Sequence, residues 1–324
     1  MILAVTEPLD VGSSLVALVG SGALDLPLPG GGTTAARFEA LAELGALDLS
    51  LARLAEGHAD AVAILAEAGR TAVAPRSPYG VWAADPPASR LHAVPEAGGS
   101  WSLHGRKRYC SGARTLTHAL VTGWTDEGLV LVEVALDQDA VRPVDGTWPA
   151  LGMAGSESLD VDFEGAVGSG VGATGWYLDR PGFWHGSVGV AACWYGGARG
   201  AADVLAAAVG EGPSAHQLAH LGAVVATCSA MGTALRAAAT AIDDDPLDAG
   251  GDAHRRALTV RAVVEAGCTS VLERVGRATG SGPLCFDGAH ARRAADLPVY
   301  LRQSHAEADL AELGRLALGD SSWR

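Results

Sequence analysis

Residues able to do chemistry are sparse in this chain, and their spacing argues against several kinds of site. Five cysteines are scattered through the 324 residues without a C-x-x-C pair, which indicates reduced, mostly buried thiols. His216 and His220 are one helical turn apart, but no third ligand and no H-E-x-x-H motif accompanies them. Gly30–Gly32 precedes a helical pattern instead of following a strand, which favours a plain flexible loop. We therefore expect neither a metal site nor a phosphate-binding loop.

The elements that must position any site change character twice along the chain. From about Thr33 to Gly69, apolar residues recur at steps of three and four, as in a helix, and Gly69 suits its C-terminal cap. From about residue 75 the sequence becomes short β-like runs bounded by Pro, Gly and Asp, and from about residue 182 it is helical again. We expect a shortened N-terminal helical region (1–74), a small β-domain (75–168) and a C-terminal helical bundle (169–324).

The composition of the chain excludes some classes of binding partner. The formal net charge of −14 repels phosphate backbones, so we expect no nucleic-acid partner. The N-terminus lacks the pattern of a signal peptide, and no uninterrupted apolar stretch reaches the roughly 18–20 residues that cross a bilayer. The sequence therefore predicts a cytoplasmic protein with no membrane association.

Two segments carry a resemblance to a known family. YGVWAADPP (Tyr79–Pro87) and WSLHGRKRYCSGA (Trp101–Ala113) resemble the paired strands of the small β-domain in acyl-CoA dehydrogenase family flavoproteins. FEALAELGALDLSLARLAEGHADA, WPALGMAGSESLDVDFEG and ATGSGPLCFDGAHARRAADLPVYLRQSH resemble further segments of that family, in the same order. The resemblance covers about Phe38 to Gly314 and implies a mainly α, acyl-CoA dehydrogenase-like fold with N-terminal helices, a small β-barrel-like middle domain and a C-terminal helical bundle.

The resemblance also implies that the first of these strands lies against a flavin, expected to be FAD. Val81, Trp82 and Ala84 would then approach the edge of the flavin ring, mainly through backbone groups. Either Ala84 or Trp82 replaces the family's usual Thr, so one hydroxyl is lost. Asp85 stands where the family has Glu, and we expect it to stabilise the turn.

The second strand supplies the sharpest of the implied flavin contacts. Tyr109 takes the place of the family's Trp beside the flavin ring, and Ser111 takes the place of a Thr whose hydroxyl hydrogen-bonds near the flavin N5, so it would keep that hydrogen-bond donor. The alternative is that both are alternating strand residues that touch no ligand. Gly280 and Gly282 fall in a turn that, in relatives, helps to receive the ADP part of FAD from a neighbouring subunit. A homo-oligomer, a dimer or a tetramer, is therefore expected.

The family's catalytic carboxylate has no evident counterpart. Aligning Asp296 with the family's R-D places Ser304 or His305 at the usual position of the glutamate base, and Glu307 is one helical turn from Ser304. The family's alternative base would fall near His185, so it too is missing. ADLPVYLRQSH also resembles the end of flavin-dependent monooxygenases of this fold, in which case His305 would relay protons. The alternative is an ordinary packing or surface histidine.

Other departures concern the cofactor's phosphates and the N-terminus. Fewer residues than usual precede Tyr79, and no R-x-x-F-G segment stands before GPSAHQLAHLG. Ala154 replaces the Arg of the family's G-M-R motif.

Three functions follow from the resemblance. The first is an acyl-CoA dehydrogenase-like oxidoreductase acting on an acyl thioester or related small molecule. The second is a flavin-dependent monooxygenase on the same scaffold. The third is a catalytically incomplete subunit that works with a paralogous subunit.

Overall fold

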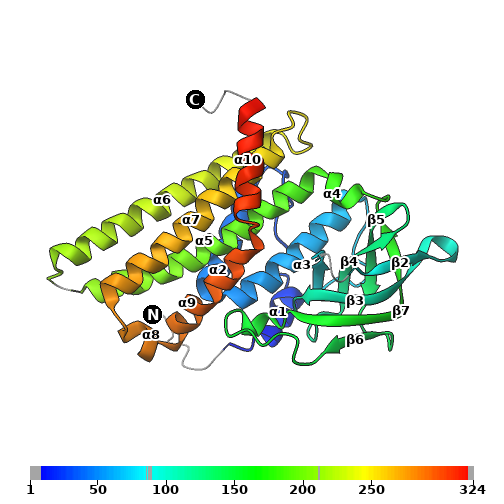
Figure 1. The fold of residues 1–324 in the computed structure, drawn as a ribbon, viewed down its shortest axis with the longest axis horizontal. Helices are drawn as coiled ribbons and strands as arrows, with labels where there is room; N and C mark the ends of the chain where they lie inside the picture. The colour runs from blue at the N-terminus through cyan, green and yellow to red at the C-terminus, as the bar shows by residue number, and fades with distance from the viewer. Residues whose placement is uncertain (1–8, 85, 87–89, 211, 320–324) are drawn as a thin grey trace.

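The order of elements predicted from the sequence is confirmed. A computed structural model describes residues 9–84, 86, 90–210 and 212–319, in which helices are followed by strands and then by a helical bundle (Figure 1). The helices that precede the strands are α1 (Val11–Ser21), α2 (Thr34–Leu47) and α3 (Leu49–Glu67). The strands are β1 (Tyr79–Trp82), β2 (His92–Pro95), β3 (Ser100–Cys110), β4 (His118–Thr125), β5 (Gly128–Ala135), β6 (Val141–Val144) and β7 (Leu159–Val171). The later helices are α4 (Trp176–Asp179), α5 (Pro181–Val209), α6 (Ala215–Asp244), α7 (Ala253–Thr279), α8 (Gly282–Phe286), α9 (Gly288–Tyr300) and α10 (Glu307–Gly319).

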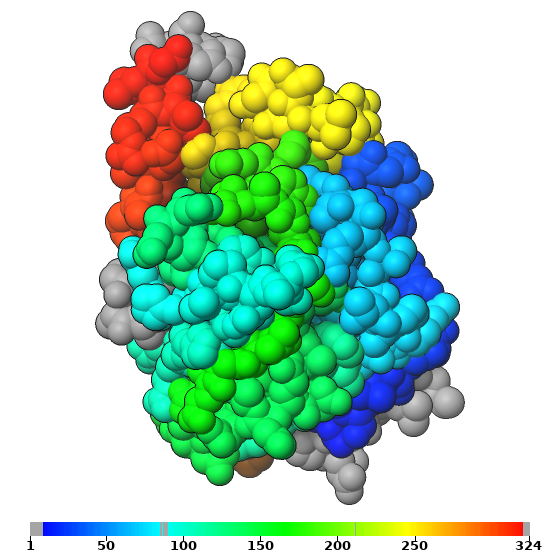
Figure 2. Space-filling view, turned by 90° about the vertical axis from the view of Figure 1, so that its right-hand side faces the viewer, coloured from blue at the N-terminus to red at the C-terminus, as the bar shows by residue number. Residues whose placement is uncertain are grey.

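The strands close into a small barrel at one end of the molecule. Neighbouring strands follow the order β1-β4-β2-β3-β7-β5, and an additional β4–β5 pairing closes the ring, while β6 adds to β7. Closure leaves few exposed edges. Leu103, Val121 and Val161 are among the apolar side chains that fill the interior, as the two-residue alternation of strands requires. Figure 2 views this end, where strand segments form most of the surface.

Helix ends are set by capping residues that the sequence displays. Asp48 ends α2 and begins α3, and its side chain accepts a hydrogen bond from the Leu51 amide. Ser214 and Gln217 form a reciprocal capping box at the start of α6. Gly69, at a φ of 69°, follows the end of α3 as expected of a C-terminal cap.

Helices α2 and α5 cross so closely that glycine is required on both. An added Cβ at Gly45 of α2 would overlap the Cys193 carbonyl oxygen, and one at Gly196 of α5 would overlap the Ala42 carbonyl oxygen. This crossing fixes the position of Cys193 and Trp194 on α5, which lie in the core of the bundle.

Helix α6 departs from the expectation that no stretch is long and apolar enough to cross a membrane. Residues 215–235 contain no Asp, Glu, Lys or Arg. By length and composition alone α6 is long and apolar enough, with a mean hydropathy of 1.5 over its most apolar window. Only 22% of that window is buried within the chain, and Leu218 and Val225 on it are about half exposed. A core helix of a soluble protein also passes this test, so α6 is weak evidence for a membrane span.

Candidate functional site

The two strand segments singled out from the sequence meet at the same end of the barrel. The Trp82 indole Nε1 donates a hydrogen bond to the Ser111 carbonyl oxygen over 3.0 Å. The Trp82 side chain is buried in the barrel, where it packs edge-on against Phe163. Val81 is half-buried and Ala84 is exposed, whereas Asp85 lies outside the described residues. The Trp82 ring is therefore structural, and its predicted role toward a flavin is confined to its backbone.

Tyr109 does not have the geometry of a regular strand residue. Its backbone has a φ of 59°, a left-handed conformation that is rare for an aromatic residue, at an irregularity between Lys107 and Cys110 in the β3–β7 pairing. This irregularity leaves the ring 47% exposed, with the Arg108 guanidinium 5.3 Å from the ring centre. Alternation along a regular strand does not explain this placement.

Ser111 belongs to a chain of three buried hydroxyls. Its Oγ lies 2.8 Å from Ser158 Oγ, which lies 2.9 Å from Ser156 Oγ, and Ser156 donates to the Met153 carbonyl over 2.7 Å. Each hydroxyl has a single proton and a carbonyl can only accept, so Ser158 donates to Ser156 and Ser111 donates to Ser158. Ser111 Oγ therefore faces any further partner as a hydrogen-bond acceptor. The sequence had indicated a donor.

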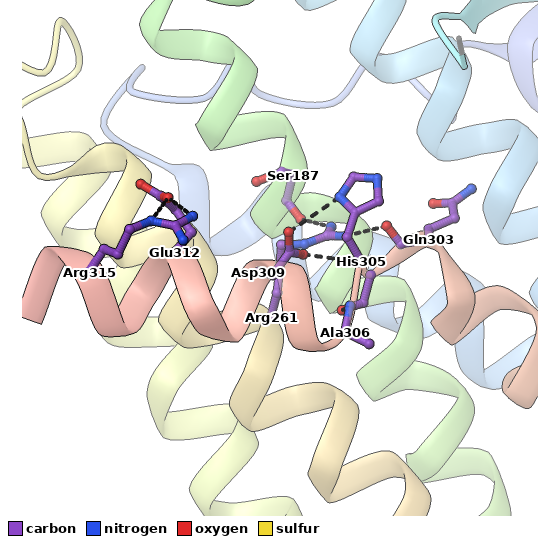
Figure 3. Close-up of polar contacts among 9 residues, drawn as sticks. Ser187, Arg261, Gln303, His305, Ala306, Asp309, Glu312 and Arg315 are labelled. Atoms are coloured by element: carbon purple, nitrogen blue, oxygen red, sulfur yellow. Dashed lines mark hydrogen bonds and ion pairs between the residues drawn. The ribbon is translucent and has the colours of Figure 1, made fainter. Parts of the chain in front are cut away.

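Ser304, His305 and Glu307 lie in an elbow between the end of α9 and the start of α10. The side chain of Ser304 is buried and its Oγ accepts a hydrogen bond from the Ala306 amide. The His305 side chain is 80% exposed and its Nδ1 lies 3.3 Å from Asp309 Oδ1 (Figure 3). Glu307 is exposed at the first position of α10. The three residues are neighbours, but the carboxylate and the imidazole face solvent.

Arg261 of α7 holds this elbow against the bundle. Its Nη1 donates to the Ser187 carbonyl over 3.0 Å, and its Nη2 donates to the Gln303 carbonyl over 2.8 Å (Figure 3). The remaining predicted pair, Gly280 and Gly282, lies beyond the other end of α7. Nineteen residues separate Arg261 from Gly280, a rise of about 28 Å along a helix. Within one chain, the Gly280 turn and the elbow are therefore separate places.

Sequence reasoning missed a group of charged residues buried between the helices. Arg53, Glu56 and Asp60 follow one another at steps of three and four along α3, so they share a face. Arg53 Nη1 contacts Glu56 Oε2 at 2.9 Å, and their side chains are only 14% and 7% exposed. Burial raises the pKa of Glu56 to about 7, although Arg53 opposes this shift. The spacing was visible in the sequence, but only the burial of α3 on most sides shows that these charges point inward.

Other histidines are explained by packing. His58 Nδ1 accepts a hydrogen bond from the Tyr79 amide over 3.2 Å, and burial lowers the pKa of His58 to about 4. His185 Nε2 lies 3.1 Å from the Pro246 carbonyl oxygen, and burial lowers its pKa as well. Among the residues that the structure describes, no cluster of three His, Cys, Asp or Glu side chains could hold a metal ion.

Comparisons with known proteins locate the fold. No family model matches the chain, and no curated protein matches its sequence. Solved structures do match along nearly its whole length. The dibenzothiophene monooxygenase TdsC of Paenibacillus sp. A11-2, in a complex with FMN and indole, is 20% identical, with 95% of this chain and 88% of that one covered at a TM-score of 0.78.

Two further structures agree. KijD3, in a complex with FMN and a dTDP-linked amino-keto sugar, is 20% identical over 95% of this chain and 86% of its own, with a TM-score of 0.79. The methanesulfinate monooxygenase MsuC of Pseudomonas fluorescens is 18% identical over 97% of each chain, with a TM-score of 0.76. The chain has the acyl-CoA dehydrogenase fold. Similarity at these sequence identities establishes only the fold. The activity of this chain has to be inferred from its own residues.

Proposed function

We propose that the chain is a flavin-dependent monooxygenase acting on a small molecule. The observation that carries the proposal is the joint placement of Tyr109 and Ser111, an exposed aromatic ring on a strained backbone beside an oriented hydroxyl. These two residues, with the backbone of Val81 and Trp82, would hold the flavin ring. A reduced flavin supplies two electrons with which one atom of O2 enters the substrate and the other leaves as water.

FMN is the proposed form of the cofactor, with FAD as the alternative. The chain lacks the family's R-x-x-F-G segment, whose arginine would reach the phosphates of FAD. FMN has no ADP part and carries one phosphate where FAD carries two, and FMN is bound in the TdsC and KijD3 structures. Titration of the purified chain with each flavin, followed by quenching of flavin fluorescence, distinguishes the two.

The proposed role of His305 is to move protons at the rim of the site. Its imidazole is exposed and Asp309 fixes one ring nitrogen, so the other nitrogen is left to exchange protons with solvent or substrate. The test supplies enzymatically reduced FMN and ¹⁸O2, then follows incorporation of label into a panel of small aromatic and sulfur compounds. Label in a product supports the proposal, and loss of that label in His305→Ala assigns the histidine.

A dehydrogenase remains the second candidate because Glu56 is a buried carboxylate that could serve as a base. Reduction of the bound flavin by an acyl thioester without O2, lost in Glu56→Gln, would favour it over the monooxygenase. If the isolated chain turns over neither the monooxygenase substrates nor the acyl thioester, and it copurifies with a paralogue that carries the catalytic carboxylate, it would instead be an incomplete subunit.

We also propose that the chain forms a homo-oligomer through α6. Its exposed face carries Leu218, Ala219, Val225, Ala226 and Ala230 without a charged residue, in a protein with a net charge of −14. An apolar helix face of this length is normally covered in a soluble protein. Light scattering coupled to size-exclusion chromatography gives the mass that tests it.

A further inference from the structure

A short segment between β6 and β7 connects α9 to the residues that follow β3, where Ser111 lies. It runs over residues 152–158 and contains the single 3-10 turn Ala154–Ser156. We call residues 152–158 the bridge segment. The segment belongs to WPALGMAGSESLDVDFEG, and Asp296 of α9 belongs to another stretch that resembles the family. The function proposed above gives Asp296 no role.

The bridge segment is anchored to α9 by a buried carboxyl group. Asp296 Oδ1 accepts a hydrogen bond from the Met153 amide over 2.5 Å, and both side chains are buried. Met153 has a φ of 58°, a left-handed conformation that residues with a side chain rarely adopt. The preceding Gly152 packs so closely on α9 that an added Cβ would overlap the Ala295 carbonyl oxygen. Contacts with α9 therefore hold Met153 in an unfavourable backbone conformation.

Asp296 is charged when it accepts this hydrogen bond. Burial raises the pKa of Asp296 to about 6, although the hydrogen bond from the Met153 amide opposes this shift. Of the charged groups nearby, Asp48 raises the pKa further, whereas Arg292 and Arg293 lower it. The carboxyl group is therefore largely ionised near neutral pH. Because a hydrogen bond to a charged acceptor is stronger than one to a neutral acceptor, Asp296 holds Met153 more firmly than a neutral side chain would.

The carbonyl group of Met153 sets the direction of the three buried hydroxyls. Its oxygen accepts from Ser156 Oγ over 2.7 Å and from Trp148 Nε1 over 3.0 Å. Since this oxygen takes the Ser156 proton, Ser158 donates to Ser156 and Ser111 donates to Ser158. If the Met153 carbonyl moved away, Ser156 could donate to Ser158 and every proton in the chain could reverse. The acceptor character of Ser111 Oγ therefore depends on the position of Met153.

A backbone hydrogen bond also joins the bridge segment to the residue after Ser111. The Gly112 amide donates to the Ser156 carbonyl oxygen over 2.7 Å. A displacement of the bridge segment should therefore change both the hydroxyl of Ser111 and the amide of Gly112. The two effects can be measured separately, because the hydroxyl faces a ligand and the amide exchanges with solvent.

We propose that Asp296 is a positioning residue that fixes the direction of the Ser111 hydroxyl from α9, so that Ser111 Oγ accepts a hydrogen bond from an N–H group of the bound flavin. Asp296 acts through Met153, Ser156 and Ser158 and not by contact with the flavin. The proposal rests on the proposed function only in naming the flavin as the partner of Ser111. The order of the hydroxyls itself requires no cofactor.

Titration of the purified full chain with FMN, followed by fluorescence quenching, tests the effect on the site. Asp296→Ala should weaken FMN binding about fivefold, as Ser111→Ala should, because both variants lose the same acceptor. The double variant should bind FMN no more weakly than either single variant, since Asp296 acts through Ser111. Asp296→Asn should bind FMN like the wild type, because its amide oxygen can still accept from the Met153 amide. Additive effects of the two alanine substitutions would overturn the proposal.

A matched control separates positioning from the stability of α9. Asp287 caps the N-terminus of α9 by accepting hydrogen bonds from the Ala289 and His290 amides. It precedes Asp296 by nine residues, a rise of about 14 Å along a helix. Asp287→Ala should lower the melting temperature through loss of the cap and leave FMN binding unchanged. If it weakens FMN binding as much as Asp296→Ala does, Asp296 contributes only to the stability of α9 and the proposal is wrong.

Amide hydrogen exchange on the flavin-free chain tests the connection without a cofactor. In Asp296→Ala, peptides that cover residues 152–158 and 109–113 should both exchange at least tenfold faster, because the Gly112 amide is bound to the bridge segment. Asp287→Ala should leave both unchanged. Unchanged exchange of residues 109–113 in Asp296→Ala would overturn the proposal. Faster exchange there in a chain that binds no FMN would reject the proposed function and leave the connection from Asp296 standing.

A second variant tests the hydroxyl chain with the anchor intact. Ser156→Ala keeps the hydrogen bond between Asp296 and Met153 but removes the hydroxyl that accepts from Ser158. Ser158 is then free to donate to Ser111, so FMN binding should weaken about as much as in Asp296→Ala. Unchanged FMN binding in Ser156→Ala would refute the proposed order of the hydroxyls, and this variant keeps the test valid if Asp296→Ala does not fold.

Discussion

The crossing of α2 and α5 offers a sharp test of the architecture that carries Trp194. Replacing Gly196 with Ala adds a methyl group that overlaps the Ala42 carbonyl oxygen on α2. Neither the methyl group nor the carbonyl can rotate away, so the two helices must separate. Overpacking of this kind costs about 1–3 kcal/mol, and we take the upper end because backbone is involved.

The gain in helix propensity offsets only part of this cost. Alanine favours a helix over glycine by about 1 kcal/mol, so Gly196→Ala should lower the free energy of unfolding by about 2 kcal/mol. At about 2–4 °C per kcal/mol, the melting temperature should fall by about 4–8 °C. The assay is thermal unfolding followed by circular dichroism, with urea unfolding as a second measure.

A glycine in open space provides the control. An added Cβ at Gly20 of α1 meets nothing within 4 Å, so Gly20→Ala should raise stability by up to about 1 kcal/mol. Gly45→Ala perturbs the same crossing from the α2 side and should cost less in the Gly196→Ala background than alone, since the helices are already apart. A Gly196→Ala protein as stable as the wild type would refute this account of the crossing.

Three further predictions concern the site and the surface. Ser111→Ala should weaken FMN binding about fivefold in fluorescence quenching by loss of one acceptor, whereas Ser102→Ala, in the body of β3, should not. The pKa of His58 is lowered to about 4, so proton uptake by this histidine in the unfolded state alone should cost the wild type roughly 3 kcal/mol of unfolding free energy relative to His58→Asn as pH falls from 7 to 4. The comparison with His58→Asn, whose amide oxygen can still accept from the Tyr79 amide, cancels the opposite change expected from Glu56, and an identical pH dependence of the two proteins in urea titrations would contradict the assignment. Val225→Glu places a charge on the exposed face of α6 and should convert the proposed oligomer to monomer in light scattering, and an unchanged mass would exclude that face as the interface.

Local patterns predicted the elements well because each is set by neighbouring residues. The β-like sequence runs Ala119–Trp124 and Leu129–Ala135 agree with β4 and β5 to within one residue, since Gly, Pro and Asp mark where strands stop. The β4–β5 pairing is a hairpin with a two-residue turn, which a local pattern can indicate, whereas the β5–β7 pairing joins strands far apart in the sequence in a way that no local pattern specifies. The barrel-like middle domain was therefore implied by the family resemblance and not by the local patterns, and it is confirmed.

The sequence names residues for the candidate site but could not give their orientation. Alternation along β1 indicates two faces but not which one looks inward, so the burial of the Trp82 ring was not foreseen. His305 was singled out, but its exposure depends on the elbow that Arg261 holds from another helix. Arg53 and Glu56 were passed over because charged residues on a helix usually face solvent.

The two hydrogen bonds by which Arg261 holds the elbow limit which substitutions this sequence can accept. Both of its hydrogen bonds end on carbonyl oxygens, at Ser187 and Gln303, and every amino acid supplies that atom. The side chains at positions 187 and 303 can therefore change without loss of these hydrogen bonds. Position 261 must keep a side chain that reaches two carbonyl oxygens at once. A saturation library should therefore show that positions 187 and 303 tolerate substitution and that position 261 does not. Even lysine should fail at position 261, because its single ammonium group lacks the planar fork of arginine.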